Sequence, residues 1–115
     1  MIGVLAPLQA ARAEYPEKPV RLIVPAAPGG AADNHARALA IELHKRLGQP
    51  FVIENKPGAS GAIGMDVVAK AAPDGYTIFM GTNTAIAANP FLFKKLPYDP
   101  IKDFAPIGRV NYFVF

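Results

Sequence analysis

Val20-Arg21-Leu22-Ile23-Val24-Pro25-Ala26-Ala27-Pro28-Gly29-Gly30-Ala31-Ala32-Asp33 passes from an apolar segment through a glycine loop to the start of a helix-like stretch. Its first five residues are mostly aliphatic and β-branched, which is typical of a buried strand. The prolines and glycines that follow predict a loop. Asp33 is suited to cap a helix, because its carboxylate accepts hydrogen bonds from the free N–H groups of a first turn. The segment therefore predicts a strand, a shaped loop and a helix in succession.

The same order recurs along the chain. Apolar residues at helical spacing predict that the first helix continues to about residue 47, where Gly48 ends it. The elements expected after it are a strand at 51–55, a helix at 61–71, a strand at 76–80, a short helical segment at 85–88 ended by Asn89-Pro90, and a strand at 108–115. Strands that alternate with helices predict an α/β fold with a parallel sheet.

The apolar spacing also predicts which helix faces are buried. On the first helix these residues are Ala36, Leu39, Ala40, Leu43 and Leu47. On the second helix they are Ile63, Val67, Val68 and Ala71.

Three loops follow the first three predicted strands, and each precedes a helix-like stretch. Because the carboxyl ends of parallel strands meet at one edge, we expect the loops to lie together there, where open α/β sheets bind ligands. Free backbone N–H groups at helix starts favour a small anion such as a carboxylate or phosphate. The residues expected to bind it are Pro28, Gly29, Gly30, Asp33, Gly58, Ala59, Ser60, Gly61, Thr82, Asn83 and Thr84.

The roles of single residues in these loops stay open between structure and binding. Asp33 is a helix cap or also a ligand contact, and the polar turn Thr82-Asn83-Thr84 is a helix cap or a donor to a carboxylate. Gly30 is expected to adopt a positive φ, so a valine there is expected to abolish binding.

Composition excludes several kinds of protein. The chain is 51% apolar and 18% charged, which is globular composition, and no apolar run is long enough to span a membrane. The net charge of +3 is scattered without interleaved aromatics, so we expect no nucleic-acid partner. The absence of cysteine excludes disulfides and cysteine nucleophiles. His35 and His44 are nine positions apart on one helix and do not predict a metal site.

Binding is favoured over catalysis, although one alternative remains. Ser60 has neither a nucleophile-elbow context nor an evident base, so we expect no enzyme activity, no cofactor and no catalytic residues. Gly58-Ala59-Ser60-Gly61-Ala62-Ile63-Gly64 does resemble the nucleotide fingerprint of extended short-chain dehydrogenases. It follows the second strand rather than the first, and no ribose-binding acid follows about 20 residues later. A fragment of a nucleotide-binding α/β enzyme is the second hypothesis.

The first thirteen residues predict export. They are mostly apolar, and Ala11-Arg12-Ala13 fits the small-x-small pattern of a signal peptidase site. A charged beginning is missing, so we interpret residues 1–13 as the remnant of a secretory signal peptide. The mature chain is expected to begin at Glu14.

Several runs of sequence, taken together, resemble the Bug-type solute-binding proteins of tripartite tricarboxylate transporters. They cover residues 15–110 and are Tyr15-Pro16-x-Lys18-Pro19-Val20-Arg21-Leu22-Ile23-Val24-Pro25, Pro28-Gly29-Gly30-x-x-Asp33, Leu47-Gly48-Gln49-Pro50, Glu54-Asn55-Lys56-Pro57-Gly58-Ala59-x-Gly61-x-x-Gly64, Pro73-Asp74-Gly75-Tyr76-Thr77 and Leu96-Pro97-Tyr98-Asp99-Pro100-x-Lys102-Asp103-Phe104-x-Pro106. Where the family often has an aromatic or hydroxyl side chain, this chain has Ala26, Ala31 and Ala32, so a side-chain contact is expected to be lost.

The resemblance implies a two-lobed, periplasmic-binding-protein-like fold that is incomplete in this chain. Residues 14–107 would form the N-terminal part of lobe one, and residues 108–115 would begin the strand that leads to an absent lobe two. The implied function is a periplasmic receptor that captures a small carboxylate and delivers it to membrane permease subunits. Neither the carboxylate nor the oligomeric state follows from the sequence.

Overall fold

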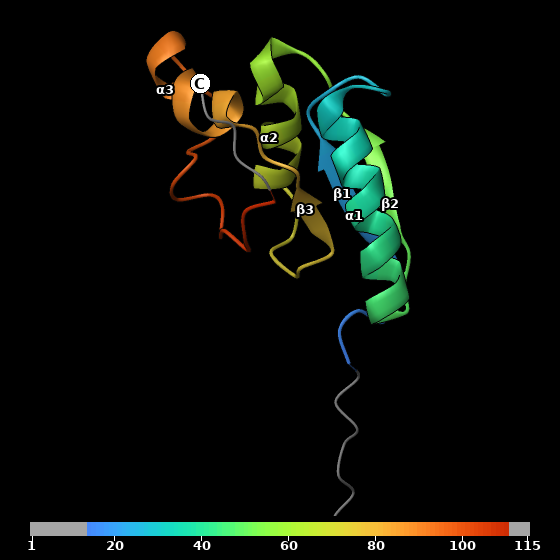
Figure 1. Cartoon of the computed structure of the whole chain (residues 1–115). Helices are drawn as coiled ribbons and strands as arrows, with labels where there is room; N and C mark the ends of the chain where they lie inside the picture. Colours follow the sequence, from blue (N-terminus) through green and yellow to red (C-terminus); the bar gives the residue numbers. More distant parts are fainter. Residues whose placement is uncertain (1–13, 111–115) are drawn as a thin grey trace, which may run out of the picture.

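The computed structural model describes residues 14–110 (Figure 1). Its elements are β1 (Val20–Val24), α1 (Ala31–Leu47), β2 (Phe51–Asn55), the 3₁₀ turn η1 (Ala59–Gly61), α2 (Ala62–Ala69), β3 (Thr77–Phe79), the π-helical segment η2 (Thr84–Ala88) and α3 (Asn89–Leu92). The predicted signal remnant and the last five residues of the expected strand at 108–115 lie outside the described residues. Residues 108–110 form no strand.

The sheet is parallel, as the alternation of strands and helices predicted. Its order is β2-β1-β3, so β1 lies in the centre. Val20 of β1 is opposite Phe51 of β2, and Arg21 is opposite Thr77 of β3. The chain therefore moves from β1 to one edge of the sheet and returns across β1 to the other edge.

Helices α1 and α2 cover opposite faces of this sheet (Figure 1). Leu22 and Val24 pack with Ala36 of α1, and all three side chains are buried. Side chains of a strand alternate between its faces, so Ile23 points to the other side. On that side Met65 of α2 lies in a cluster that Phe79 of β3 joins. Burial on both faces explains why β1 is an almost continuous apolar run.

The first helix begins earlier than its sequence predicted. Its N-cap is Gly30, which has no side chain to cap the helix, and Asp33 lies inside the first turn. The prediction that Asp33 caps the helix is therefore wrong. Its carboxylate instead accepts from the N–H of Gly29, in the preceding loop, at 2.9 Å. The predicted end is confirmed, since Gly48 has φ 78° and its N–H donates to His44 O.

The buried faces were predicted only in part. Ala36 and Ala40 of α1 are buried, but Leu47 is 41% exposed. On α2 the side chain of Ile63 is 48% exposed, whereas Met65 is 1% exposed. In so short a helix, a shift of two residues changes which side faces the sheet.

Asn89-Pro90 does not end the third helical segment, contrary to expectation. The chain continues without a break from η2 into α3, where Pro90 occupies the first turn. Pro90 has no N–H to donate, and Ala85 O, which would be its acceptor in the π-helical pattern, accepts from the Tyr98 hydroxyl instead, at 2.7 Å. The π-helical geometry just before it includes a bond from Asn89 N to Thr84 O.

Candidate ligand-binding site

A polar hollow of about 370 Å³ lies at the carboxyl edge of the sheet. Its lining residues come from the loops after all three strands and are Pro25, Gly58, Ser60, Gly61, Thr82, Asn83 and Thr84. All except Pro25 were predicted from the sequence. Pro25 is the first residue after β1, and its position at a strand end was the signal that could have identified it. The volume is within the usual range for small-molecule sites.

The hollow also lies where the topology favours ligand binding. In the strand order β2-β1-β3, the first connection leaves β1 for β2 and the second crosses to β3. The crevice outside the carboxyl ends of β1 and β3 is therefore a topological switch point, the usual ligand position in open parallel sheets. Pro25 follows β1 and Thr82 follows β3, so both sides of this crevice contribute to the lining.

The turn after β2 consists of residues with positive φ. The values are 115° at Gly58, 47° at Ala59, 53° at Ser60 and 89° at Gly61. Each non-glycine residue in this region costs about 1–2 kcal/mol, so the surroundings must hold the turn in place. One stabilising contact is the hydrogen bond from Gly61 N to Gly58 O, at 3.0 Å.

Gly61 brings the three loops into close contact. A Cβ atom built at this position would lie 2.8 Å from the Cβ of Ala85 and 3.4 Å from the Cβ of Pro25. Ala85 belongs to the segment after β3, and Pro25 follows β1. A side chain at position 61 would therefore push apart the loops that form the hollow.

Thr82 lies two residues before η2, on the third side of the hollow. Its Oγ1 accepts a hydrogen bond from Ala85 N at 3.3 Å, and its carbonyl oxygen accepts from Ile86 N at 3.1 Å. This supports the capping role of Thr82, while contacts of Thr82, Asn83 and Thr84 with a ligand stay predictions. Among residues 14–110, no charged side chain lines the hollow, so a ligand there would meet neutral hydroxyl, amide and backbone groups.

The loop after β1 supports the site without lining the hollow. Pro28, Gly29, Gly30 and Asp33 are not among the lining residues, and neither is Ala59 of the second loop. Gly29 has φ 88°, whereas Gly30 has an ordinary φ of −76°. The expectation of a positive φ at Gly30 is therefore wrong. Within the described part of the chain, a Cβ at Gly30 would have one neighbour within 4 Å, Ala27 O at 3.6 Å. Binding roles for these residues remain untested predictions.

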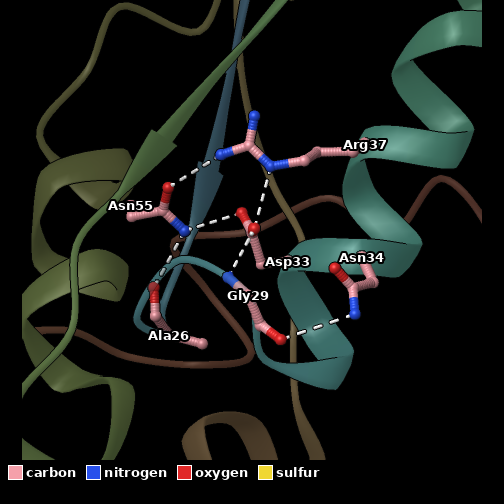
Figure 2. A network of polar contacts seen from close by, with 6 residues as sticks. All are labelled: Ala26, Gly29, Asp33, Asn34, Arg37 and Asn55. Atoms are coloured by element: carbon pink, nitrogen blue, oxygen red, sulfur yellow. Dashed lines mark hydrogen bonds and ion pairs between the residues drawn. The ribbon is translucent and has the colours of Figure 1, made fainter.

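A network around Asp33 holds this loop against β2 (Figure 2). The Asp33 carboxylate, 1% exposed, accepts from Arg37 Nε at 2.8 Å, Gly29 N at 2.9 Å and Asn55 Nδ2 at 2.9 Å. These donors, Arg37 foremost, lower the pKa of the Asp33 carboxyl well below its usual value, against the opposing effect of burial. The carboxylate thus stays ionised and engaged with the protein.

Asn55 is a residue of this network that the sequence analysis did not single out. At the end of β2, its Nδ2 donates both to Asp33 and to Ala26 O, each at 2.9 Å (Figure 2). It therefore connects the loop after β1, the helix start and the neighbouring strand. A polar residue at the end of an apolar strand was the available signal, but its partner is 22 positions away in sequence.

Three other findings concern the described residues. A larger hollow of about 620 Å³ is lined by residues 86–101, but it contains no predicted site residue and is mainly apolar. Within residues 14–110, no group of three or more His, Cys, Asp or Glu residues is arranged to hold a metal ion. No helix in the same range is both long and apolar enough to cross a membrane.

The chain is similar to known transport receptors in sequence and in structure. A family model described as tripartite tricarboxylate transporter family receptor matches residues 35–115. BugT of Bordetella pertussis is 42% identical over 110 residues, which cover 95% of this chain and 33% of BugT. The solved periplasmic binding protein BugD is 45% identical with a TM-score of 0.75, covering 82% of this chain and 31% of BugD. MatC from Rhodopseudomonas palustris, solved with bound malate, is 46% identical with a TM-score of 0.76, covering 80% of this chain and 31% of MatC.

These similarities confirm the resemblance to Bug-type proteins and the parallel-sheet fold of periplasmic binding proteins. The chain spans about a third of the length of these relatives. The family match extends from α1 to the end of the chain, and both structural matches exceed 40% identity. The chain therefore belongs to the tripartite tricarboxylate transporter receptor family.

Proposed function

We propose that this chain supplies one wall of a binding site for a small carboxylate in an extracytoplasmic solute receptor. The observation that carries the proposal is the polar hollow at the carboxyl edge, where three predicted loops meet. Its donors are Ser60, Thr82, Asn83, Thr84 and the backbone N–H groups of the glycine turn other than that of Gly61, which donates to Gly58 O. Neutral, oriented donors of this kind can bind a carboxylate without a lysine or arginine.

Relatives indicate the chemical class of the ligand. MatC was solved with malate, a small dicarboxylate. The family description refers to tricarboxylate transport, and BugD is called a periplasmic binding protein. By analogy we propose a periplasmic location and delivery of the ligand to membrane permease subunits. We also propose that residues 14–107 belong to lobe one, with a second lobe supplying the opposite wall.

A thermal-shift titration of the purified chain with malate tests the proposal. One wall alone leaves the ligand in contact with water, so loss of half the roughly 8 kcal/mol of a micromolar site leaves about millimolar affinity. We therefore expect the melting temperature to rise only at malate concentrations of about 1–10 mM. The matched variants are Asn83→Ala, in the hollow, and Gln49→Ala, which removes an amide side chain on the loop before β2, at the opposite end of the sheet.

The outcomes separate the two functional hypotheses. Asn83→Ala should remove most of the malate-induced shift, and Gln49→Ala should retain it. Equal malate shifts in the two variants would contradict the assignment of the hollow. Stabilisation by NAD(P) instead of malate would favour the nucleotide-binding alternative, which rests on the glycines from Gly58 to Gly64.

A further inference from the structure

A buried polar network connects the start of α3 with the glycine turn of the hollow. Asn89 is 0% exposed, and its Nδ2 donates to Ser60 O at 3.0 Å and to the hydroxyl of Tyr98 at 3.1 Å. The Tyr98 hydroxyl in turn donates to Ala85 O at 2.7 Å. Neither Asn89 nor Tyr98 lines the polar hollow, and 29 positions separate Asn89 from Ser60.

The orientation of the Asn89 amide follows from its neighbours. Ser60 offers a carbonyl oxygen, and the Tyr98 hydroxyl already donates its proton to Ala85. Reversing the amide would place its oxygen against two acceptors. The Asn89 Oδ1 atom has no hydrogen-bond partner among the described residues. Among the described residues, the hydrogen bonds of the Asn89 side chain are therefore the two that its Nδ2 donates.

The contact with Ser60 acts on a peptide group that forms part of the hollow. Ser60 has the left-handed values φ 53° and ψ 37°. Its carbonyl group shares a peptide plane with the N–H of Gly61, which donates to Gly58 O at 3.0 Å. Rotating this plane would break both hydrogen bonds. Asn89 thus opposes the relaxation of Ser60 to a more favourable backbone conformation.

We propose that Asn89 is a positioning residue, which fixes the Ser60–Gly61 peptide group and thereby the ligand-facing turn of the hollow. This inference rests on the proposed function for its effect on ligand affinity. The orientation of the turn itself does not depend on that function, so the two can be tested separately.

Amide hydrogen exchange of the whole chain, followed by NMR, tests the positioning without a ligand. In Asn89→Leu the Ser60 bond is lost, and we expect the Gly61 amide to exchange about 3- to 10-fold faster. The Lys56 amide, which donates to Val24 O at 2.8 Å, serves as the internal reference and should change less than about twofold by the same scale. Tyr98→Phe is the matched variant, because it removes the hydroxyl but retains the Asn89–Ser60 bond. Equal acceleration of Gly61 exchange in both variants, or none in Asn89→Leu, would overturn the proposal.

Malate affinity and a rescue variant give a second test. Asn89→Leu should weaken malate binding by about 3- to 10-fold. Glycine tolerates positive φ, so position 60 should need less support from Asn89 in a Ser60→Gly background. The double variant should therefore bind malate less than 3- to 10-fold more weakly than Ser60→Gly alone. A merely structural role predicts the same loss in both backgrounds.

The remaining outcomes are also decisive. If the unmodified chain binds no malate, the proposed function fails, and Gly61 exchange still decides the positioning. If Asn89→Leu does not fold, Asn89→Ser replaces it, because serine keeps one donor on a shorter side chain. Faster Gly61 exchange in Asn89→Ser than in Tyr98→Phe supports the proposal, and unchanged exchange overturns it.

Discussion

Substitution of Gly61 by alanine should separate backbone conformation from loop packing. An alanine at φ 89° costs about 1–2 kcal/mol, because Cβ approaches the following carbonyl oxygen. The new Cβ would also lie 2.8 Å from the Cβ of Ala85, and overpacking of this kind costs about 1–3 kcal/mol. Together these effects predict a loss of about 2–5 kcal/mol, a large part of the roughly 5–15 kcal/mol that stabilises a typical domain.

Gly48→Ala is the matched control. Gly48 has a similar φ of 78°, but a Cβ there would meet no atom of the described residues within 4 Å. Only the conformational cost of about 1–2 kcal/mol is expected. Urea unfolding of both variants and the unmodified chain measures the difference. With a denaturant slope of about 1–3 kcal/mol/M, the midpoint of Gly61→Ala should lie about 1 M below that of Gly48→Ala. Equal midpoints would refute the conclusion that position 61 is closely packed between the loops.

Two further predictions concern the core and the Asp33 network. Met65 is 1% exposed and lies in the same cluster as Tyr98. Met65→Ala should lower the free energy of unfolding, measured in urea, by about 2–5 kcal/mol. A loss below about 1 kcal/mol would contradict its packed position. The folded-state pKa of Asp33 is lowered, so its ionisation stabilises the fold above the usual pKa of 3.8, and this contribution is lost as pH falls below that value. At about pH 7 the urea midpoint of Asp33→Asn should therefore be lower than that of the unmodified chain. Between about pH 7 and 3 it should fall less steeply with pH. Parallel profiles would argue against an ionised, hydrogen-bonded Asp33.

The sequence predicted the sheet because its signals are local. The apolar residues from Val20 to Val24, followed by prolines and glycines, indicate a strand and its end without reference to distant residues. The parallel arrangement then follows from the alternation of strands and helices. The common edge of the three loops follows from the parallel arrangement. Most residues that line the hollow could therefore be predicted from the sequence.

The errors arose where tertiary contacts decide local geometry. Aspartate is a residue type that often caps helices. The Asp33 carboxylate instead accepts hydrogen bonds from the side chains of Arg37 and Asn55. Gly29 and Gly30 are chemically identical, and only the path of the loop determines which one has positive φ. Pro90 suggested a helix end, but the helical run continues through it, and the Tyr98 hydroxyl donates to Ala85 O in place of the missing N–H.

The residue types of the hollow and the orientation of its donors are therefore determined in different parts of the sequence. Its donors are peptide groups and small polar side chains whose types can be recognised within short turns. Their orientation depends on residues outside those turns, such as Asn55, 22 positions from Asp33, and Asn89, 29 positions from Ser60. A site built from neutral donors is sensitive to orientation, because hydrogen bonds weaken steeply as their angles depart from linearity. We therefore expect differences in affinity among related receptors to arise from such supporting residues as well as from those that line the hollow.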